Sequence, residues 1–338
     1  MTRLRVETFD LVGVGLVAAF AAWSVLSSQV RGGDPFPQVA LVAATATTYA
    51  IGRAQGKRYV AMVAAVVAIG ILIAAIASGP RAFWGVPFVP PLGYANANGA
   101  LYGQGVAAAA IVATIARRTL TKAVFGLLAL VLCGLAVASG SVAAAVLAVG
   151  VLVAALAARW LGYRFVLLAP LLVVASVVTT VIVGMTHGAP AVPVLEQALT
   201  ERRAVLWQEA LTMFAAQPVF GVGPGMFAVT SPTALANPDA QWAHSAHLQV
   251  AAETGLIGVL LLAATLLWVY AGLYRSRQIL GVVVIGTAAV TGFIVQASMD
   301  YLLHFPALVL IVALLVGIAS SRLSSAFDSE STATSGGT

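Results

Sequence analysis

The sequence predicts an all-α polytopic membrane protein with about ten transmembrane helices and one long extracytoplasmic loop that carries an interfacial helix. Hydrophobic residues make up 61% of the 338 residues and charged residues only 8%, whereas a soluble domain carries about 25% charged residues. The net charge of +6 comes from short basic clusters between apolar runs. Such clusters set the orientation of a membrane protein, so no nucleic-acid partner is expected. The single cysteine, Cys133, excludes an internal disulfide.

Ten segments are apolar enough to cross a bilayer, which takes roughly 20 residues, although some are barely long enough. They are 9–28, 38–52, 59–78, 99–116, 123–139, 142–158, 165–184, 246–271, 279–298 and 306–321. Only Ser139, Gly140 and Ser141 separate segments 123–139 and 142–158, so one long kinked helix is the alternative there.

The basic residues predict the orientation of these segments. With the N-terminus inside, 13 of the 17 Lys and Arg residues fall in inner loops and 4 in outer loops. Because basic residues favour the cytoplasmic side, both termini are predicted inside and residues 185–245 outside. We expect one membrane domain over 1–323. The tail over 324–338 is rich in Ser, Thr and Gly and is expected to be disordered in the cytoplasm.

Polar residues concentrate between Glu201 and Gly258. Residues 196–216 have helical spacing and place Arg203 and Trp207 on one face, and a tryptophan suits a membrane interface. His244 and His247 stand at the start of the eighth span. The HExxH pattern and a third ligand are absent, so no metal is predicted. The GVGPG run lacks the lysine of a phosphate loop and is expected to turn the chain tightly.

Glu253 lies roughly two turns inside an apolar helix. An ionisable group at that depth is costly and is normally functional with a partner. Arg203 or Arg202 folding back onto it is the expected partner. Five polar residues of the other outer loops could line a polar site or cap a helix or turn: Arg81, Asn96, Asn98, Asp300 and His304.

Three stretches resemble the O-antigen ligase and polymerase superfamily. Residues 244–258, HSAHLQVAAETGLIG, fit the H-[NSQ]-x9-G-x-x-[GTY] signature of O-antigen ligases. Arg203-x3-Trp207 followed by PVFGVGPGMF resembles the R-x3-W and P-x-x-G-x-G-x-F block of the wider superfamily. GYANANGALYG is similar to its N-P-N-x-x-A segment, with Ala97 in place of the proline. The family's Ser-Arg pair lacks its arginine here, so that phosphate contact is absent or comes from Arg81.

The resemblance implies transfer of a glycan from undecaprenyl pyrophosphate to an acceptor hydroxyl on the outer face of the bacterial cytoplasmic membrane. It implies no cofactor, and its partners are the lipid-linked donor, a glycan or lipid acceptor and membrane lipids. By resemblance, His244 and Arg203 are the catalytic pair. The residues expected to bind substrate are Arg202, Glu253, Trp207, Arg81, Asn98 and His247.

The chemistry of these residues agrees with the resemblance, and it leaves alternatives open. The charge that grows on a leaving pyrophosphate needs cationic donors, which Arg203 and Arg202 can supply. His244 could accept the acceptor's proton or bind the pyrophosphate as a cation. A polymerase of lipid-linked repeats would use the same donor and the same residues. A polyprenyl-glycan transporter or flippase is the alternative of another class, but the sequence lacks the internal repeats expected of one.

Overall fold

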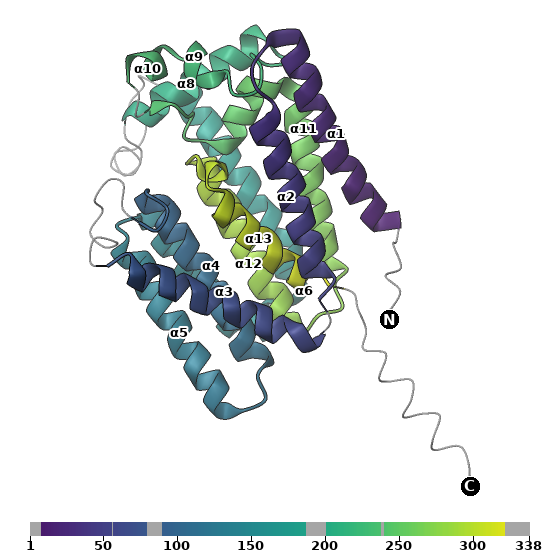
Figure 1. The fold of residues 1–338 in the computed structure, drawn as a ribbon, viewed down its shortest axis with the longest axis vertical. Helices are drawn as coiled ribbons and strands as arrows, with labels where there is room; N and C mark the ends of the chain where they lie inside the picture. The colour runs from purple at the N-terminus through teal and green to yellow at the C-terminus, as the bar shows by residue number, and fades with distance from the viewer. Residues whose placement is uncertain (1–7, 56, 80–89, 187–200, 238–239, 322–338) are drawn as a thin grey trace.

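The computed structural model describes residues 8–55, 57–79, 90–186, 201–237 and 240–321, and these residues form helices without any β-strand (Figure 1). In chain order the helices are α1 (Thr8–Arg31), α2 (Phe36–Arg53), α3 (Lys57–Ala77), α4 (Ala95–Ile115), α5 (Thr119–Ala138), α6 (Val142–Met185), α8 (Glu201–Ala216), α9 (Phe227–Thr230), α10 (Pro232–Ala236), α11 (Ala246–Tyr274), α12 (Leu280–Ser298), the 3₁₀ turn η3 (Leu302–His304) and α13 (Pro306–Ala319). The predicted tail over 324–338 lies outside the described residues.

Each of the ten apolar segments coincides with a helix or a part of one, to within two residues. Among the described residues, seven helices are long and apolar enough to cross a membrane, and α13 is a shorter apolar helix. One of the seven, α6, has 44 residues, or about 66 Å at 1.5 Å per residue. It is broken at Gly162, where φ is 55° and ψ is −159°, between the two predicted segments 142–158 and 165–184. The polytopic helical class is confirmed, and the count of ten spans stays a prediction.

The connection between α5 and α6 settles one alternative. Helix α5 ends at Ala138 and α6 begins at Val142. The side chain of Ser141 accepts a hydrogen bond from the backbone N–H of Ala144 at 3.3 Å and caps the new helix. One continuous kinked helix over 123–158 is therefore wrong.

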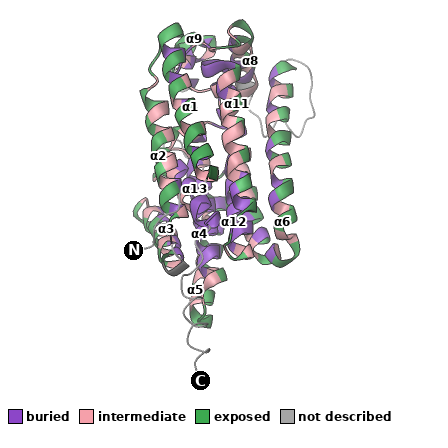
Figure 2. Cartoon of the chain, turned by 90° about the vertical axis from the view of Figure 1, so that its right-hand side faces the viewer, coloured by how far each residue is buried: buried purple, intermediate pink, exposed green. Residues whose placement is uncertain are grey.

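Helices α4 and α12 form the centre of the bundle. In the most apolar stretch of 18 residues of each of these helices, 83% of the residues are buried. The corresponding share is 11–28% in the other five candidate spans. Figure 2 shows this contrast between the buried α4 and α12 and the exposed faces of the outer helices. Large apolar side chains such as Leu11, Ile73, Leu130 and Leu156 are exposed on those faces. Apolar surface of this extent suits contact with lipid.

One end of the bundle is covered by α8, α9 and α10 (Figure 1). Helix α8 buries Leu206, Trp207, Ala210 and Met213 in a second hydrophobic cluster, together with Phe227 and residues that precede and begin α11. The helix predicted as interfacial is thus packed onto the bundle. Asp10 and Ser320 both contact Arg53, so the start of α1 and the end of α13 both lie beside the end of α2 at the other end of the bundle.

Candidate active site

A buried carboxylate, Asp300, contacts polar side chains from three other parts of the chain. It follows α12 and is 1% exposed. Nη2 of Arg203, from α8, lies 3.4 Å from its Oδ2, and Nδ1 of His244, from the segment before α11, lies 3.3 Å from its Oδ1. The hydroxyl of Tyr94 donates to the carboxylate, at 2.9 Å from Oδ2 and 3.1 Å from Oδ1, and Nδ2 of Asn96 donates to Oδ2 at 2.5 Å. Arg203 and His244 therefore meet on one carboxylate.

Asp300 is ionised in this environment. Burial by itself would raise the pKa of a carboxyl, but the contacts with His244 and Arg203 outweigh it and hold the pKa of Asp300 below its ordinary value. The backbone N–H of Tyr301 is a further donor, at 2.8 Å. Burial and the neighbouring Asp300 raise the pKa of Tyr94, and they raise the pKa of Tyr301 to about 12. Both phenols therefore keep their protons.

His244 is held through its backbone, and its Nδ1 approaches Asp300 at 3.3 Å without a well-aligned hydrogen bond. Its φ of 50° is uncommon for a residue other than glycine. Nε1 of Trp207 donates to the carbonyl oxygen of His244 at 3.1 Å. The side chain of the next residue, Ser245, caps α11 by accepting from the N–H of Leu248 at 3.4 Å. The imidazole meets the ring of Tyr301 edge-on at 4.6 Å. With Nδ1 toward Asp300, Nε2 is the nitrogen on the other side of the ring.

Arg203 contacts the same carboxylate. It lies in α8, one helical turn before Trp207. Its side chain is 18% exposed, and Nη2 also lies 3.3 Å from the hydroxyl of Tyr94. Both contacts use the same nitrogen, whereas a guanidinium has five N–H donors. No other partner of the guanidinium occurs in the part of the chain that the structure describes. Arg203 therefore retains donors for an anionic ligand.

The glycine-rich run repairs a break in α11. At Gly255, φ is 66° and ψ is −165°, so the helical hydrogen bonds stop there. The segment 218–223 supplies replacements: the N–H groups of residues 222 and 223 donate to the carbonyls of 252–253 at 2.8 and 3.0 Å, and Leu256 donates to Pro218 at 2.8 Å. Irregular backbone at membrane depth is tolerated only when other protein groups satisfy it. The GVGPG run thus turns the chain against α11.

Glu253 binds this same loop. It is 2% exposed. Its Oε2 accepts from Nε2 of Gln38 at 2.6 Å and its Oε1 from Nε2 of Gln249 at 3.1 Å. The backbone N–H groups of Gly225 and Phe227 also donate to the carboxyl. Glu253 therefore ties α2 and α11 to the loop that leads into α9.

The predicted pairing of Glu253 with Arg203 is wrong. Arg203 contacts Asp300, because the start of α8 lies beside the link between α12 and η3. The partners of Glu253 are amides instead. Arg202 is in α8, and its side chain is outside the described residues, as is the whole of Arg81.

Asn96 and Asn98 lie close together in the sequence but have different contacts. Asn98 is 1% exposed; its Oδ1 accepts from the N–H of Leu92 at 2.9 Å and its Nδ2 donates to the carbonyl of Pro90 at 3.3 Å. It holds the turn that precedes α4. Asn96 contacts Asp300 instead. The substrate-binding residue predicted in this loop was Asn98, and the residue that the structure brings to the carboxylate is Asn96.

The substrate-binding roles predicted for Trp207 and His247 stay predictions. Trp207 is 0% exposed, so it positions His244 and has no free surface for a ligand. His247 is in the first turn of α11, and its Nδ1 is buried without a hydrogen-bond partner among the described residues. The structure does not bring His247 to Asp300.

Aromatic rings surround the carboxylate cluster. Tyr94 stacks on Tyr301 at 4.8 Å and on Phe305 at 5.9 Å between ring centroids. The rings of Trp242 and His304 lie beside them, tilted by 33° with their centroids 3.7 Å apart. Rings in these positions limit the access of water, and charges interact more strongly where water is scarce.

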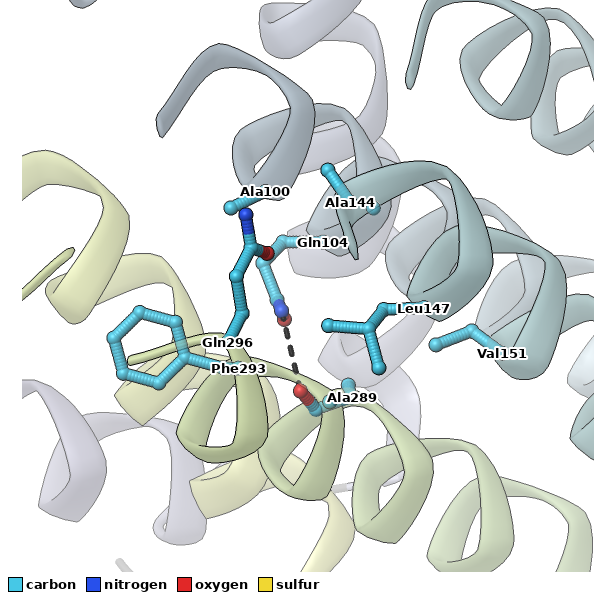
Figure 3. Close-up of a pocket in the computed structure, with 10 residues that line it drawn as sticks. Ala100, Gln104, Ala144, Leu147, Val151, Ala289, Phe293 and Gln296 are labelled. Carbon is cyan, nitrogen blue, oxygen red and sulfur yellow. Dashed lines mark hydrogen bonds between the residues drawn. The ribbon is translucent and has the colours of Figure 1, made fainter. Parts of the chain in front are cut away.

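Two buried side-chain amides, Gln296 of α12 and Gln104 of α4, hold these two helices together next to the site. Gln296 donates from Nε2 to the backbone carbonyl of Asn96 at 3.1 Å, and Gln104 donates to the carbonyl of Ala289 at 3.2 Å. Both line a small cavity between α4, α6 and α12 (Figure 3). The bond from Gln296 fixes the first turn of α4 against α12, and the bond from Gln104 holds the middle of α4 against it. Asn96 is thereby held against Asp300.

Sequence reasoning did not select Asp300, Asn96 or Tyr94 as site residues. Asp300 and Asn96 were recognised only as polar residues that could line a site or cap a turn. The sequence signal that could have selected Asp300 and Asn96 is that their loops and His244 are all predicted on the outer side of the membrane. Among the described residues, no group of three His, Cys, Asp or Glu side chains could share a metal ion, and the predicted absence of a metal stays a prediction.

Comparison with known proteins gives one family match. The O-antigen ligase family model matches residues 123–263. The matched region runs from α5 into α11, and it includes Arg203, His244 and the glycine-rich run; Asp300 and Asn96 lie outside it. A comparison with curated proteins gave no match.

Proposed function

We propose that the chain is a membrane glycosyltransferase of the O-antigen ligase and polymerase superfamily, a proposal that the family match over residues 123–263 supports. It transfers a glycan from undecaprenyl pyrophosphate to an acceptor hydroxyl at the outer face of the bacterial cytoplasmic membrane. The observation that supports this most is that Arg203 and His244, from two separate segments, share the buried carboxylate of Asp300.

Arg203 binds the leaving group in this proposal. Cleavage of the bond between the sugar and the pyrophosphate leaves growing negative charge on the pyrophosphate oxygens. A guanidinium stabilises that charge through paired, charge-assisted hydrogen bonds. Asp300 and Tyr94 orient Arg203 through Nη2, and its remaining donors face the pyrophosphate.

His244 is the base. Ionised Asp300 next to Nδ1 favours the tautomer with its proton on Nδ1, which leaves a lone pair on Nε2. Asp300 also stabilises the imidazolium that forms when Nε2 takes a proton, as an orienting carboxylate does in other His-based sites. Asp300 is thus a positioning residue for both members of the pair.

The reaction is one displacement at the anomeric carbon. The acceptor oxygen forms a bond to that carbon while the bond from the carbon to the pyrophosphate oxygen breaks. The hydroxyl proton passes to Nε2 of His244, and the electron pair of the broken bond leaves with the pyrophosphate beside Arg203. A single displacement inverts the configuration of the sugar.

Purified full-length protein tests this assignment, with undecaprenyl pyrophosphate release as the measurement. We expect His244→Ala to lower the transfer rate by about 10²–10⁴-fold, the usual contribution of a positioned base. Arg203→Lys should also be slow, because a point charge cannot make the bidentate contact. Arg31→Ala is the control, because Arg31 is an exposed arginine at the end of α1. Transfer at the wild-type rate by His244→Ala would remove the histidine from the mechanism.

The signature that begins at His244 favours a ligase over a polymerase. A ligase passes the finished glycan to a different molecule, whereas a polymerase adds it to another lipid-linked repeat. A deletion strain separates the two activities. A ligase predicts accumulation of long glycans on undecaprenyl pyrophosphate; accumulation of single lipid-linked repeats would establish the polymerase activity instead.

A further inference from the structure

A groove at the end of the bundle away from Asp300 takes no part in the proposed reaction. It lies between the first half of α6 and the start of α12 and has a volume of about 340 Å³. Its walls are apolar except for one guanidinium, and they consist of Ala155, Leu156, Ala158, Arg159, Leu280 and Gly281. Leu156 is 78% exposed, so the groove opens on the surface that faces lipid.

Arg159 is the charged group of this groove. Its side chain is exposed, and it has no ion pair with any residue that the structure describes. The guanidinium lies over the ring of Trp160 at 4.0 Å from the centroid, and Trp160 is itself 69% exposed. Tryptophan and arginine together are typical of the level of lipid headgroups.

The surroundings of the groove are strongly basic. Contacts between Tyr163 and Ser276 and between Gly281 and Thr114 bring three inter-helix links to this end. These links and the helix residues next to them carry Arg117, Arg118, Lys122, Arg164, Arg275 and Arg277. Of the described acidic residues, Asp10 lies at this end, and it is paired with Arg53. An anionic ligand is therefore favoured over a neutral or cationic one.

The start of α12 adds to this preference. Leu280 and Gly281 are its first residues, and the preceding residue makes no side-chain cap. The N–H groups of a first helical turn favour a negative charge. They border the same groove as the guanidinium of Arg159.

We propose that this groove binds one anionic phospholipid. The phosphate lies between Arg159 and the first turn of α12, and an acyl chain follows the apolar wall along Ala155 and Leu156. Basic pockets between transmembrane helices bind anionic headgroups in this way. The proposal is independent of the glycosyl transfer and of which leaflet faces the groove.

Native mass spectrometry of the full-length protein in detergent tests the proposal. The probes are phosphatidylglycerol and phosphatidylcholine with identical acyl chains. Wild-type protein should retain one phosphatidylglycerol at lipid concentrations where phosphatidylcholine is lost. Arg159→Ala should weaken phosphatidylglycerol binding by about five-fold, the effect of one cation near a lipid headgroup. Ala155→Trp should fill the groove and weaken binding without any change of charge.

Lys122→Ala is the matched control, because Lys122 is exposed at the same end and does not line the groove. It should change phosphatidylglycerol binding by less than about two-fold. An equal loss in Lys122→Ala and Arg159→Ala would mean diffuse attraction to the basic end and would overturn the site. Equal retention of both lipids by the wild type would overturn the assignment of an anionic ligand. Equal thermal unfolding midpoints show that each variant is folded.

Discussion

Asp300→Asn is the most informative substitution, because it keeps the shape of the side chain and removes its charge. The carboxylate accepts from Arg203 and Asn96 at Oδ2 and from the N–H of Tyr301 at Oδ1, where His244 also lies. An asparagine must place its NH₂ group at one of these two positions. In either orientation a donor then faces another donor.

The size of the effect follows from the burial of the groups involved. Removal of one partner from a fully buried ion pair costs about 3–5 kcal/mol. The side chains of Arg203 and His244 are 18% and 16% exposed, so water recovers part of that cost. We expect a loss of about 1–3 kcal/mol in the free energy of unfolding. The transfer rate should fall by about 10²–10⁴-fold, because Nδ1 of His244 loses the group that orients it.

The assay combines single-turnover transfer with thermal unfolding of the same purified protein. Asp34→Asn is the control: Asp34 is exposed, and its Oδ1 accepts from the N–H of Phe36 at 2.9 Å. It should leave the rate unchanged. A rate for Asp300→Asn within about three-fold of the wild-type rate would refute the role of the carboxylate, since that change is under 1 kcal/mol of activation free energy.

Acid titration checks the charge of Asp300 separately. Its pKa in the folded protein is below the ordinary value of 3.8. Its contribution to stability is therefore present above pH 3.8 and is lost as the pH falls through the lower folded-state value. Asp300→Asn should lack this part of the acid-side decline. A decline identical to that of the wild type would show that the carboxylate is not stabilised by its neighbours.

Three further predictions concern the fold and the orientation. Gly255→Ala should lower the free energy of unfolding by more than about 2 kcal/mol, because φ is 66° and a Cβ would lie 2.2 Å from a backbone oxygen. The control is Gly70→Ala, which has open space around the new Cβ and should be neutral or slightly stabilising. Glu253→Ala should cost about 1–3 kcal/mol by leaving buried amide donors unpaired, measured as a lower unfolding midpoint, and an unchanged midpoint would show that water replaces the carboxylate. Without the native cysteine, Ala236→Cys should react with an impermeant thiol reagent in intact cells and Thr119→Cys should not; both positions are exposed, and the reverse pattern would invert the orientation.

The sequence by itself determined the class of protein and the location of its helices. Apolar runs are local properties, and each appears in the structure as a helix or as part of one. Residues 201–258 could be selected because polar residues are rare elsewhere, and Arg203 and His244 could be selected from their resemblance to a family. The break in α11 was also encoded locally, since Gly255 is the residue that tolerates its backbone angles.

Only the tertiary structure decided which polar groups meet. Arg203 or Arg202 was the expected partner of Glu253, because an ionisable group deep in an apolar helix needs a partner. Glu253 binds Gln38 and Gln249 instead. The partner of Arg203 is Asp300, at the end of another span. No local pattern encodes that contact, since it depends on how α8 packs against α6 and α11 and on how Gln296 holds α4. Apolar helices specify burial in a membrane, whereas the pairing of their ends follows from the packing of the whole bundle.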